Sequence, residues 1–191
     1  MSISVSERDT YESMWGAVEG YSRESPGERY LPAFLQMVGS ERGTVLDAGC
    51  GTGKAALALE QAGFSVTLCD LTADGIVADA RHFRFERACL WQASLQFGIW
   101  RYDYGFCCDV LEHVPTQFTM LAVARLLEAC KRGVFLSVSL VPDQYGMWVG
   151  KALHQTVQPY EWWLASLGEL GEIVEARDLL DVGIYFVKPR R

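Results

Sequence analysis

The sequence of 191 residues predicts an α/β protein with a doubly wound, mostly parallel sheet that ends in an antiparallel hairpin. Three observations predict this class. From about residue 41, short β-type runs alternate with helical patterns, which is typical of βαβ units. The last two β-type runs have little sequence between them, which predicts the hairpin. The first forty residues carry two helical patches but too few apolar residues for a domain, so we expect an N-terminal helical arm against the sheet.

The predicted elements follow in chain order. Strands are expected at 44–48, 66–70, 88–92, 104–108 and 133–140, and the hairpin strands at 172–180 and 182–189. Helices are expected at 53–62, 73–81, 116–130 and 160–170. The connection from Gln92 to Tyr104 is short for a crossover helix, so an irregular loop is expected there. We therefore divide the chain into an arm or lid at residues 1–40 and a single domain at residues 41–191.

Composition and charge exclude several classes of protein. The net charge of −7 argues against a large binding surface for nucleic acid or an anionic membrane. The N-terminal segment lacks the apolar core of a signal peptide, and no apolar run approaches the length of a membrane span. The six cysteines form no CxxC pair and lie mostly in apolar runs, so we expect neither disulfides nor a structural zinc site. A cytoplasmic location, no membrane partner and no metal are expected.

The stretch VLDAGCGTGKAAL places three glycines at alternate positions after a hydrophobic run. A P-loop, which holds a triphosphate, needs a glycine where Ala48 stands and a magnesium-binding hydroxyl where Ala55 stands, so this interpretation fails. A dinucleotide-binding loop accommodates Gly49 and Gly51 but needs a third glycine where Lys54 stands. A nicotinamide-dependent oxidoreductase is therefore disfavoured.

The segment LDAGCGTG resembles the first motif of the class I S-adenosylmethionine-dependent methyltransferases, an acidic residue followed by G-x-G-x-G. Three glycines let the backbone pass close to a ligand that carries no phosphate. The resemblance implies a Rossmann-like fold with S-adenosylmethionine as the cofactor, bound along Gly49, Cys50, Gly51 and Gly53. Asp47 would then face the positive α-ammonium group of the methionine moiety, directly or through water.

Two later segments match the same family at the expected distances. Asp70 ends the second strand and, with Leu71 after it, is placed to bind both ribose hydroxyls. The segment YDYGFCCDVLEHVP resembles the fourth motif and places Asp109 at the rim of the cofactor site. By the same resemblance, Ala93 and Ser94 contact adenine through backbone groups.

The arm resembles the segment that covers the cofactor in small methyltransferases. In that family an aromatic residue shields the ligand and an arginine binds the methionine carboxylate. The corresponding residues in this sequence are Tyr11, Trp15, Tyr21 and Arg23. Arg23 is equally consistent with a solvated surface position.

Three residues are candidates for catalysis: Asp109, His113 and His154. Methyl transfer depends mainly on alignment, and it needs a base only when the acceptor must lose a proton. His113 is either a general base or a residue that fixes its loop through backbone hydrogen bonds. His154 lies in the long connection after the fifth strand, where a lid is expected. We expect His154 to face the substrate, while Trp162 or Trp163 packs in the core.

The leading hypothesis is methyl transfer to a small-molecule acceptor, because the chain is acidic and carries no extra recognition domain. One alternative is a macromolecular acceptor, either a protein side chain or RNA. Another is a module that binds S-adenosylmethionine without catalysis. The oligomeric state stays open.

Overall fold

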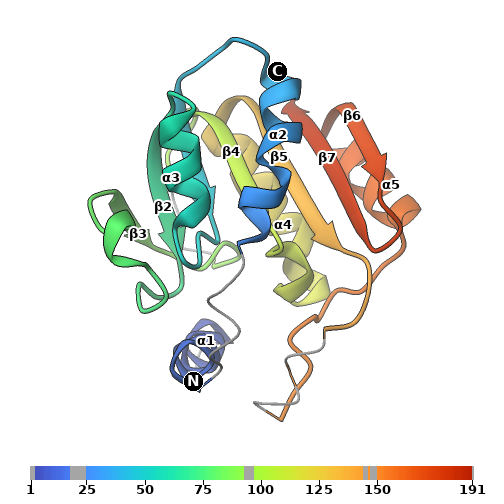
Figure 1. The fold of residues 1–191 in the computed structure, drawn as a ribbon. Helices are drawn as coiled ribbons and strands as arrows, with labels where there is room; N and C mark the ends of the chain where they lie inside the picture. The colour runs from blue at the N-terminus through green and yellow to red at the C-terminus, as the bar shows by residue number, and fades with distance from the viewer. Residues whose placement is uncertain (1–2, 18–24, 93–96, 144–145, 147–149, 191) are drawn as a thin grey trace.

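The computed structural model describes residues 3–17, 25–92, 97–143, 146 and 150–190 (Figure 1). Within these residues the strands are β1 (Thr44–Ala48), β2 (Ser65–Asp70), β3 (Arg84–Arg87), β4 (Tyr102–Cys108), β5 (Cys130–Ser139), β6 (Gly171–Asp178) and β7 (Val182–Pro189). The helices are α1 (Ile3–Ala17), α2 (Pro26–Val38), α3 (Lys54–Gln61), α4 (Thr116–Ala129) and α5 (Tyr160–Leu170). Two short 3₁₀ turns, η1 (Ala78–Ala80) and η2 (Leu111–His113), complete the set.

The strands form one sheet in the order β3-β2-β1-β4-β5-β7-β6. Strands β1 to β5 run parallel, and β7 is antiparallel to both of its neighbours. The predicted mostly parallel sheet with a final antiparallel hairpin is confirmed. The strand order reverses between β1 and β4, and open α/β sheets bind ligands at the carboxyl edge of such a point.

Helices cover both faces of the sheet, with α2 and α3 on one face and α4 and α5 on the other (Figure 1). Phe34 of α2 is fully buried, and its ring lies 5.3 Å from that of Phe106 and 5.7 Å from that of Phe135. Each such aromatic pair adds roughly 0.5–1.5 kcal/mol beyond simple burial. Gly27 lets α2 approach α3, because a Cβ there would lie 2.7 Å from the Cβ of Ala55. Helix α2 is thus packed into the core.

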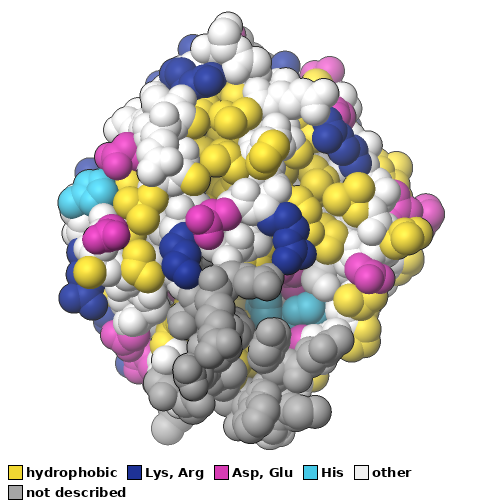
Figure 2. All heavy atoms as spheres, viewed as in Figure 1, with side chains coloured by type: hydrophobic (Ala, Val, Ile, Leu, Met, Phe, Trp, Pro, Cys, Tyr) yellow, Lys and Arg dark blue, Asp and Glu magenta, His cyan; other side chains and the backbone are white. Residues whose placement is uncertain are grey.

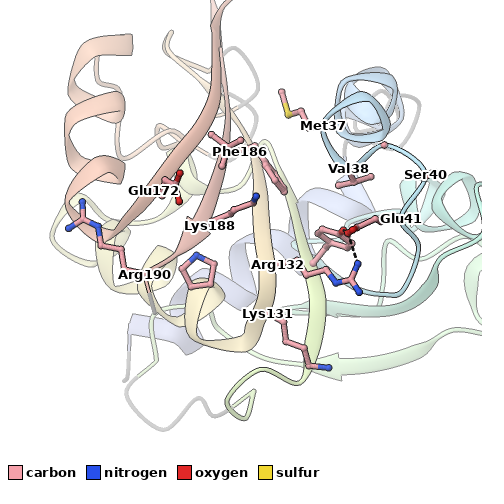
Figure 3. A pocket seen from close by; sticks show the side chains of 14 residues that line it. Met37, Val38, Ser40, Glu41, Lys131, Arg132, Glu172, Phe186, Lys188 and Arg190 are labelled. Carbon is pink, nitrogen blue, oxygen red and sulfur yellow. Dashed lines mark hydrogen bonds and ion pairs between the residues drawn. The ribbon is translucent and has the colours of Figure 1, made fainter.

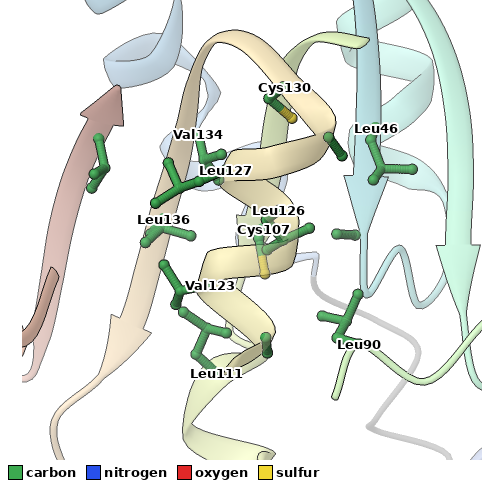
Figure 4. Packing of buried hydrophobic residues seen from close by; sticks show 14 of the residues in the cluster. Leu46, Leu90, Cys107, Leu111, Val123, Leu126, Leu127, Cys130, Val134 and Leu136 are labelled. Atoms are coloured by element: carbon green, nitrogen blue, oxygen red, sulfur yellow. The ribbon is translucent and has the colours of Figure 1, made fainter. Parts of the chain in front are cut away.

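The core on the other face is built around α4 (Figure 4). Val123, Leu126 and Leu127 follow helical spacing and pack with Cys107 of β4 and Leu136 of β5. The apolar pattern predicted this helix to within one residue of its observed end, and the chain then runs directly from α4 into β5.

The strand predicted at 88–92 is wrong, because the third strand is β3, which ends at Arg87. The β3 sequence is RFER, and a strand at the sheet edge can carry charged side chains on its solvent side. Cys89 and Leu90, whose apolar character suggested a strand, are buried in the loop that follows.

The helix predicted at 73–81 is also wrong, because only η1 forms within that range. The N–H of Val77 donates to the carbonyl of Thr52 at 3.0 Å, a long-range bond that replaces a helical one. Gly75 lies directly against the ring of Trp15 in α1. The irregular connection expected before β4 is confirmed over the described residues 97–101.

The thiols of all six cysteines are free, and five of these residues are buried. Figure 2 shows Lys and Arg interspersed with Asp and Glu over the face viewed, rather than segregated by sign. In the described part of the chain, no helix has the length and apolar character that crossing a membrane requires.

Candidate active site

A cavity of about 770 Å³ lies at the carboxyl edge of the parallel strands. Its walls come from the ends of β1, β2 and β4, from α1 and the start of α2, and from the connection after β5. In Figure 1, α1 and this connection both lie below the sheet. The predicted site residues that line the cavity are Tyr11, Trp15, Asp47, Gly49, Cys50, Gly51, Asp70, Leu71, Asp109, His113 and His154.

Gly53 is the one predicted residue that the structure describes outside this wall. Gly53 ends the glycine loop and caps α3. Tyr21, Arg23, Ala93 and Ser94 lie outside the residues that the structure describes.

The glycine loop has a backbone that side chains rarely adopt. The φ angles of Gly49, Gly51 and Gly53 are 77°, 50° and 73°. A Cβ on Gly49 would lie 2.2 Å from a methyl carbon of Val110, and one on Gly53 would lie 2.7 Å from the Cβ of Ala80. A Cβ on Gly51 would meet only the Trp15 ring, at 3.5 Å, which is an ordinary contact. Glycine is favoured at this position because of its positive φ angle. The loop therefore passes closely beneath the cavity.

Asp70 fixes the glycine loop to the end of β2. Its Oδ2 accepts a hydrogen bond from the N–H of Gly51 at 2.9 Å, and its Oδ1 accepts one from the N–H of Leu71 at 2.6 Å. Burial raises the pKa of Asp70, while hydrogen bonds from these backbone groups oppose the rise. The backbone N–H of Thr72 is a third donor to this carboxylate, which leaves about one of its four acceptor sites for a ligand in the cavity. Asp70 thus shapes the loop in addition to facing the ligand.

Asp47 is a buried carboxylate on the cavity wall, only 3% exposed. Its Oδ2 is buried without a hydrogen-bond partner. Burial and the charge of nearby Asp70 raise the pKa of Asp47 to about 7. An unpartnered carboxylate in such a position is a receptor for a cationic group.

Asp109 begins the segment after β4 with a φ of 54°, which is unusual for a residue with a side chain. Its N–H donates to the carbonyl of Ser137 at 3.0 Å, and its Oδ1 is buried without a partner. Burial raises the pKa of Asp109, and electrostatic interactions with His154 and Arg29 oppose the rise. With this strained backbone, Asp109 lies in the wall of the cavity.

Glu112 lies in η2 and is completely buried. Its Oε1 accepts a hydrogen bond from the N–H of Ser139 at 2.8 Å. Its backbone carbonyl accepts the N–H groups of Gln155 at 2.7 Å and Thr156 at 2.9 Å. Glu112 therefore joins η2 to the end of β5 and to the connection that follows it.

His113 and His154 meet at the cavity wall as a result. Their rings are nearly perpendicular, with centroids 4.7 Å apart. Burial and the charge of His154 lower the pKa of His113 to about 3, so His113 is neutral near pH 7. His154 lines the cavity, and Trp163 is fully buried in the core.

Helix α1 closes one side of the cavity with two aromatic residues. The Trp15 ring lies over the glycine loop and against Gly75, where a Cβ would be 2.5 Å from the ring. The Tyr11 ring lies edge-on to His113, with centroids 5.9 Å apart. The arm therefore reaches both the glycine loop and the histidine pair.

Sequence reasoning missed several residues of the site. Arg29, in the first turns of α2, brings a guanidinium group to the cavity. Asp143 accepts the N–H groups of Gly146, Leu153 and, at 3.2 Å, His154, so it shapes the connection after β5. A Pro-Asp pair shortly after a strand is a turn signal that identifies Asp143 in retrospect. The position of Arg29 had no such local signal.

A second cavity of about 850 Å³ lies at the amino edge of the same sheet, between the end of α2 and the hairpin (Figure 3). Figure 3 shows Glu41 and Arg132 pointing toward each other within it, and they form an ion pair. The hydroxyl of Tyr104 also donates to Glu41, at 2.8 Å. Glu41 and Arg132 thus satisfy each other, and open α/β sheets bind ligands at the opposite, carboxyl edge.

The sequence and the fold were compared with those of known proteins. The family model described as "Methyltransferase domain" matches residues 22–182. No curated protein sequence matches the chain significantly.

Several solved structures share the fold. One is a 1,6-didemethyltoxoflavin-N1-methyltransferase from Burkholderia thailandensis with bound 1,6-didemethyltoxoflavin and S-adenosylhomocysteine, at 16% identity and a TM-score of 0.72, covering 97% of this chain and 88% of that chain. A complex of DhpI with S-adenosylhomocysteine has 20% identity and a TM-score of 0.69, covering 98% and 97%. The N-methyltransferase NodS from Bradyrhizobium japonicum WM9 has 13% identity and a TM-score of 0.65, covering 96% and 98%.

The family match spans most of the chain and includes the whole glycine loop, β4 and η2. The chain therefore belongs to the methyltransferase-domain family, the class I S-adenosylmethionine-dependent methyltransferases.

Proposed function

We propose that the cavity at the carboxyl edge binds S-adenosylmethionine and transfers its methyl group to a small-molecule acceptor. The observation that carries this proposal is Asp47, a buried carboxylate without a partner beside a loop of three positive-φ glycines. A methionine moiety brings an α-ammonium group and no phosphate, which suits both features. Solved relatives in fold are complexed with S-adenosylhomocysteine, which supports the same cofactor here.

The remaining cofactor contacts follow from the wall of the cavity. Asp70 and Leu71 would receive the ribose, and Trp15 would cover the glycine loop and the bound ligand. The adenine would lie toward Trp91 and the adjoining Ala93 and Ser94. Asp109 would border the cofactor opposite the glycine loop.

The methionine carboxylate needs a cationic partner. Arg23 is the residue that the family resemblance assigns, and Arg29 lines the cavity as a second guanidinium. We propose that residues 1–40 act as an arm in which α1 closes over the cofactor, while the domain at residues 41–191 supplies the sheet.

The acceptor would occupy the end of the cavity between Tyr11, His113 and His154. A cavity of about 770 Å³ lies within the range of roughly 300–1,000 Å³ typical of small-molecule sites. The fold relative from Burkholderia thailandensis holds 1,6-didemethyltoxoflavin together with S-adenosylhomocysteine. These points favour a small acceptor over a protein or RNA chain.

The side chains at this end determine the chemistry available. His113 is a weak base because its pKa is about 3, so His154 and Asp109 are the better candidates to assist an acceptor that loses a proton. The free thiols of the six cysteines are consistent with a reducing, cytoplasmic location.

Isothermal calorimetry with S-adenosylhomocysteine tests cofactor binding, and release of S-adenosylhomocysteine from S-adenosylmethionine with a metabolite pool tests turnover. We expect saturable binding at one site and turnover with a small-molecule fraction. Binding without turnover on any fraction would indicate the non-catalytic module instead. Absence of binding would contradict the proposal as a whole.

A further inference from the structure

Glu112, His113 and His154 bring one ligand atom each to within 4.8 Å of one another at the acceptor end of the cavity. They come from two segments about forty residues apart in the sequence. The combination of two imidazoles and one carboxylate is a common donor set for divalent transition metals.

Each of these side chains has a free donor atom. The Nδ1 of His154 lies 2.7 Å from the carbonyl of Val141. Because a carbonyl only accepts, this nitrogen carries the hydrogen, and Nε2 is left with its lone pair. The Nδ1 of His113 and the Oε2 of Glu112 are both buried without a partner.

The supporting bonds resemble the outer shell of a metal site. A metal-binding histidine usually donates its second ring nitrogen to a carbonyl or carboxylate, as His154 does to Val141. A metal-binding carboxylate is usually held by a further hydrogen bond, as Glu112 is by the N–H of Ser139. Asp143 fixes the backbone N–H groups of Leu153 and His154, which sets the position of the second imidazole.

A carboxylate oxygen that is buried without a hydrogen-bond partner costs free energy unless a cation binds to it. Glu112 has no exposed surface, yet one of its oxygen atoms has no hydrogen-bond donor. Asp109, which interacts electrostatically with Glu112, has another buried oxygen atom that lacks a hydrogen-bond partner. A cation with two positive charges would satisfy the free oxygen of Glu112 and offset the repulsion between the two carboxylates.

We propose that Glu112, His113 and His154 bind one divalent transition metal ion, and that this ion holds a hydroxyl oxygen of the acceptor. Its role rests on the proposed methyl transfer, whereas binding of the ion does not. Two imidazole donors favour iron, nickel, copper or zinc over magnesium, and the carboxylate also accepts Mn²⁺ as a weaker-binding probe of the site. Three protein ligands leave further coordination positions open toward the cavity.

In this proposal the two histidines and Glu112 act by holding the ion, and neither imidazole accepts the proton of the acceptor. Coordination lowers the pKa of the acceptor hydroxyl, which loses its proton to water. The oxygen then forms a bond to the methyl carbon, and the carbon–sulfur bond breaks with its electron pair on sulfur. The products are the methyl ether and S-adenosylhomocysteine.

Titration of the full chain with Mn²⁺, followed by electron paramagnetic resonance of the free ion, tests the site directly. We expect one bound Mn²⁺ per chain. Loss of an outer-shell partner typically costs roughly 10–100-fold in metal affinity, and we expect His154→Ala and Glu112→Gln, which remove ligands, to cost at least tenfold. Glu112→Gln retains an oxygen for the Ser139 N–H, which keeps the fold intact.

His82→Ala is the matched control, because His82 is an exposed histidine that bonds Glu60 outside the cavity. Mn²⁺ affinity should not change in this variant. No Mn²⁺ binding, or equal affinity in wild type and His154→Ala, would overturn the inference.

S-adenosylhomocysteine titrations on the same samples separate this inference from the proposed function. Normal binding of S-adenosylhomocysteine without a metal site would leave the function standing and remove the ion. A metal site that needs Glu112 and His154, in a chain that does not bind S-adenosylhomocysteine, would support the site and remove its methyl-transfer role.

Discussion

The two cavities lie at opposite edges of one sheet and have similar volumes, about 770 and 850 Å³. They differ in how their charged groups are partnered. At the amino edge, Glu41 bonds Tyr104 and Arg132, and Asp103 accepts two hydrogen bonds of 2.9 Å from Thr44. At the carboxyl edge, buried oxygen atoms lack a partner, and they belong to Asp47, Asp109 and Glu112.

The pKa values follow the same division. Burial raises the pKa of Asp103, but hydrogen bonds from Thr44 outweigh it and hold the value below its ordinary one. Asp103 therefore stabilises the fold above its unfolded pKa, and this contribution is lost as pH falls. Asp47, with a pKa of about 7, destabilises the fold as pH rises toward 7, because the folded state then disfavours its charge. Buried groups that cost stability locate the binding site better than cavity volume does.

The largest effect should come from the acceptor end of the carboxyl edge. His154→Ala should lower turnover by roughly 10²–10⁴-fold, since acceptor activation is lost, and should change affinity for S-adenosylhomocysteine less than about twofold. Steady-state kinetics and calorimetry measure the two quantities. Arg132→Ala breaks an ion pair of the amino edge and should leave both unchanged. Equal losses of turnover in the two variants would remove the distinction between the edges.

A pair of glycine variants compares the two edges directly. Gly49→Ala places a Cβ 2.2 Å from Val110 at a φ of 77°, and strain plus overpacking together cost about 2–6 kcal/mol. Affinity for S-adenosylhomocysteine should fall more than about 30-fold. Gly39→Ala has a similar φ of 63° but no atom within 4 Å of its Cβ. It should lower only the melting temperature, and loss of binding there would contradict this account.

Replacing one carboxylate at each edge should change stability in opposite directions. Asp47→Asn should raise the melting temperature near pH 8, because it removes a buried charge without a partner, and should lower cofactor affinity by about 10–100-fold. Asp103→Asn should lower the melting temperature and leave affinity unchanged. Thermal melts and calorimetry on both variants give the comparison. A drop in melting temperature for Asp47→Asn would mean that Asp47 is a structural residue.

The smallest effect concerns a partly exposed ion pair at the carboxyl edge, between exposed Lys151 and buried Glu7. Lys151 Nζ lies 3.6 Å from Glu7 of α1, and such pairs contribute about 0–1 kcal/mol. Lys151→Ala should therefore change affinity for S-adenosylhomocysteine by less than about fivefold. The effect should weaken at high salt, though less than for the exposed ion pair of Glu41 with Arg132 at the amino edge. A larger, salt-independent loss would show that the pair itself holds α1 closed.

Local patterns predicted the parts of the site that are contiguous in sequence. The three glycines, the acidic residue before them and the segment after β4 each carry their signal within a few residues. The order of parallel strands then brings Asp47, Asp70 and Asp109 to one edge. The hairpin and α4 were equally accessible, because apolar periodicity defines them.

The remaining features depend on contacts between distant residues. Strand β3 was misplaced because an edge strand tolerates charged side chains, which hides its pattern. The predicted helix at 73–81 failed because Thr52 and Trp15 hold that segment from elsewhere in the chain. The meeting of His113 with His154 depends on two backbone bonds to Glu112, and no local signal announces them.

The pH dependence of cofactor binding tests the central claim, that an unpartnered Asp47 receives the cationic group of the cofactor. Asp47 must be ionised to bind the α-ammonium group, and its pKa in the free protein is about 7. Calorimetry with S-adenosylhomocysteine should therefore show roughly tenfold higher affinity at about pH 8 than at about pH 5.5. In Asp47→Asn, this dependence on pH should disappear. The same dependence in wild type and Asp47→Asn would contradict the account.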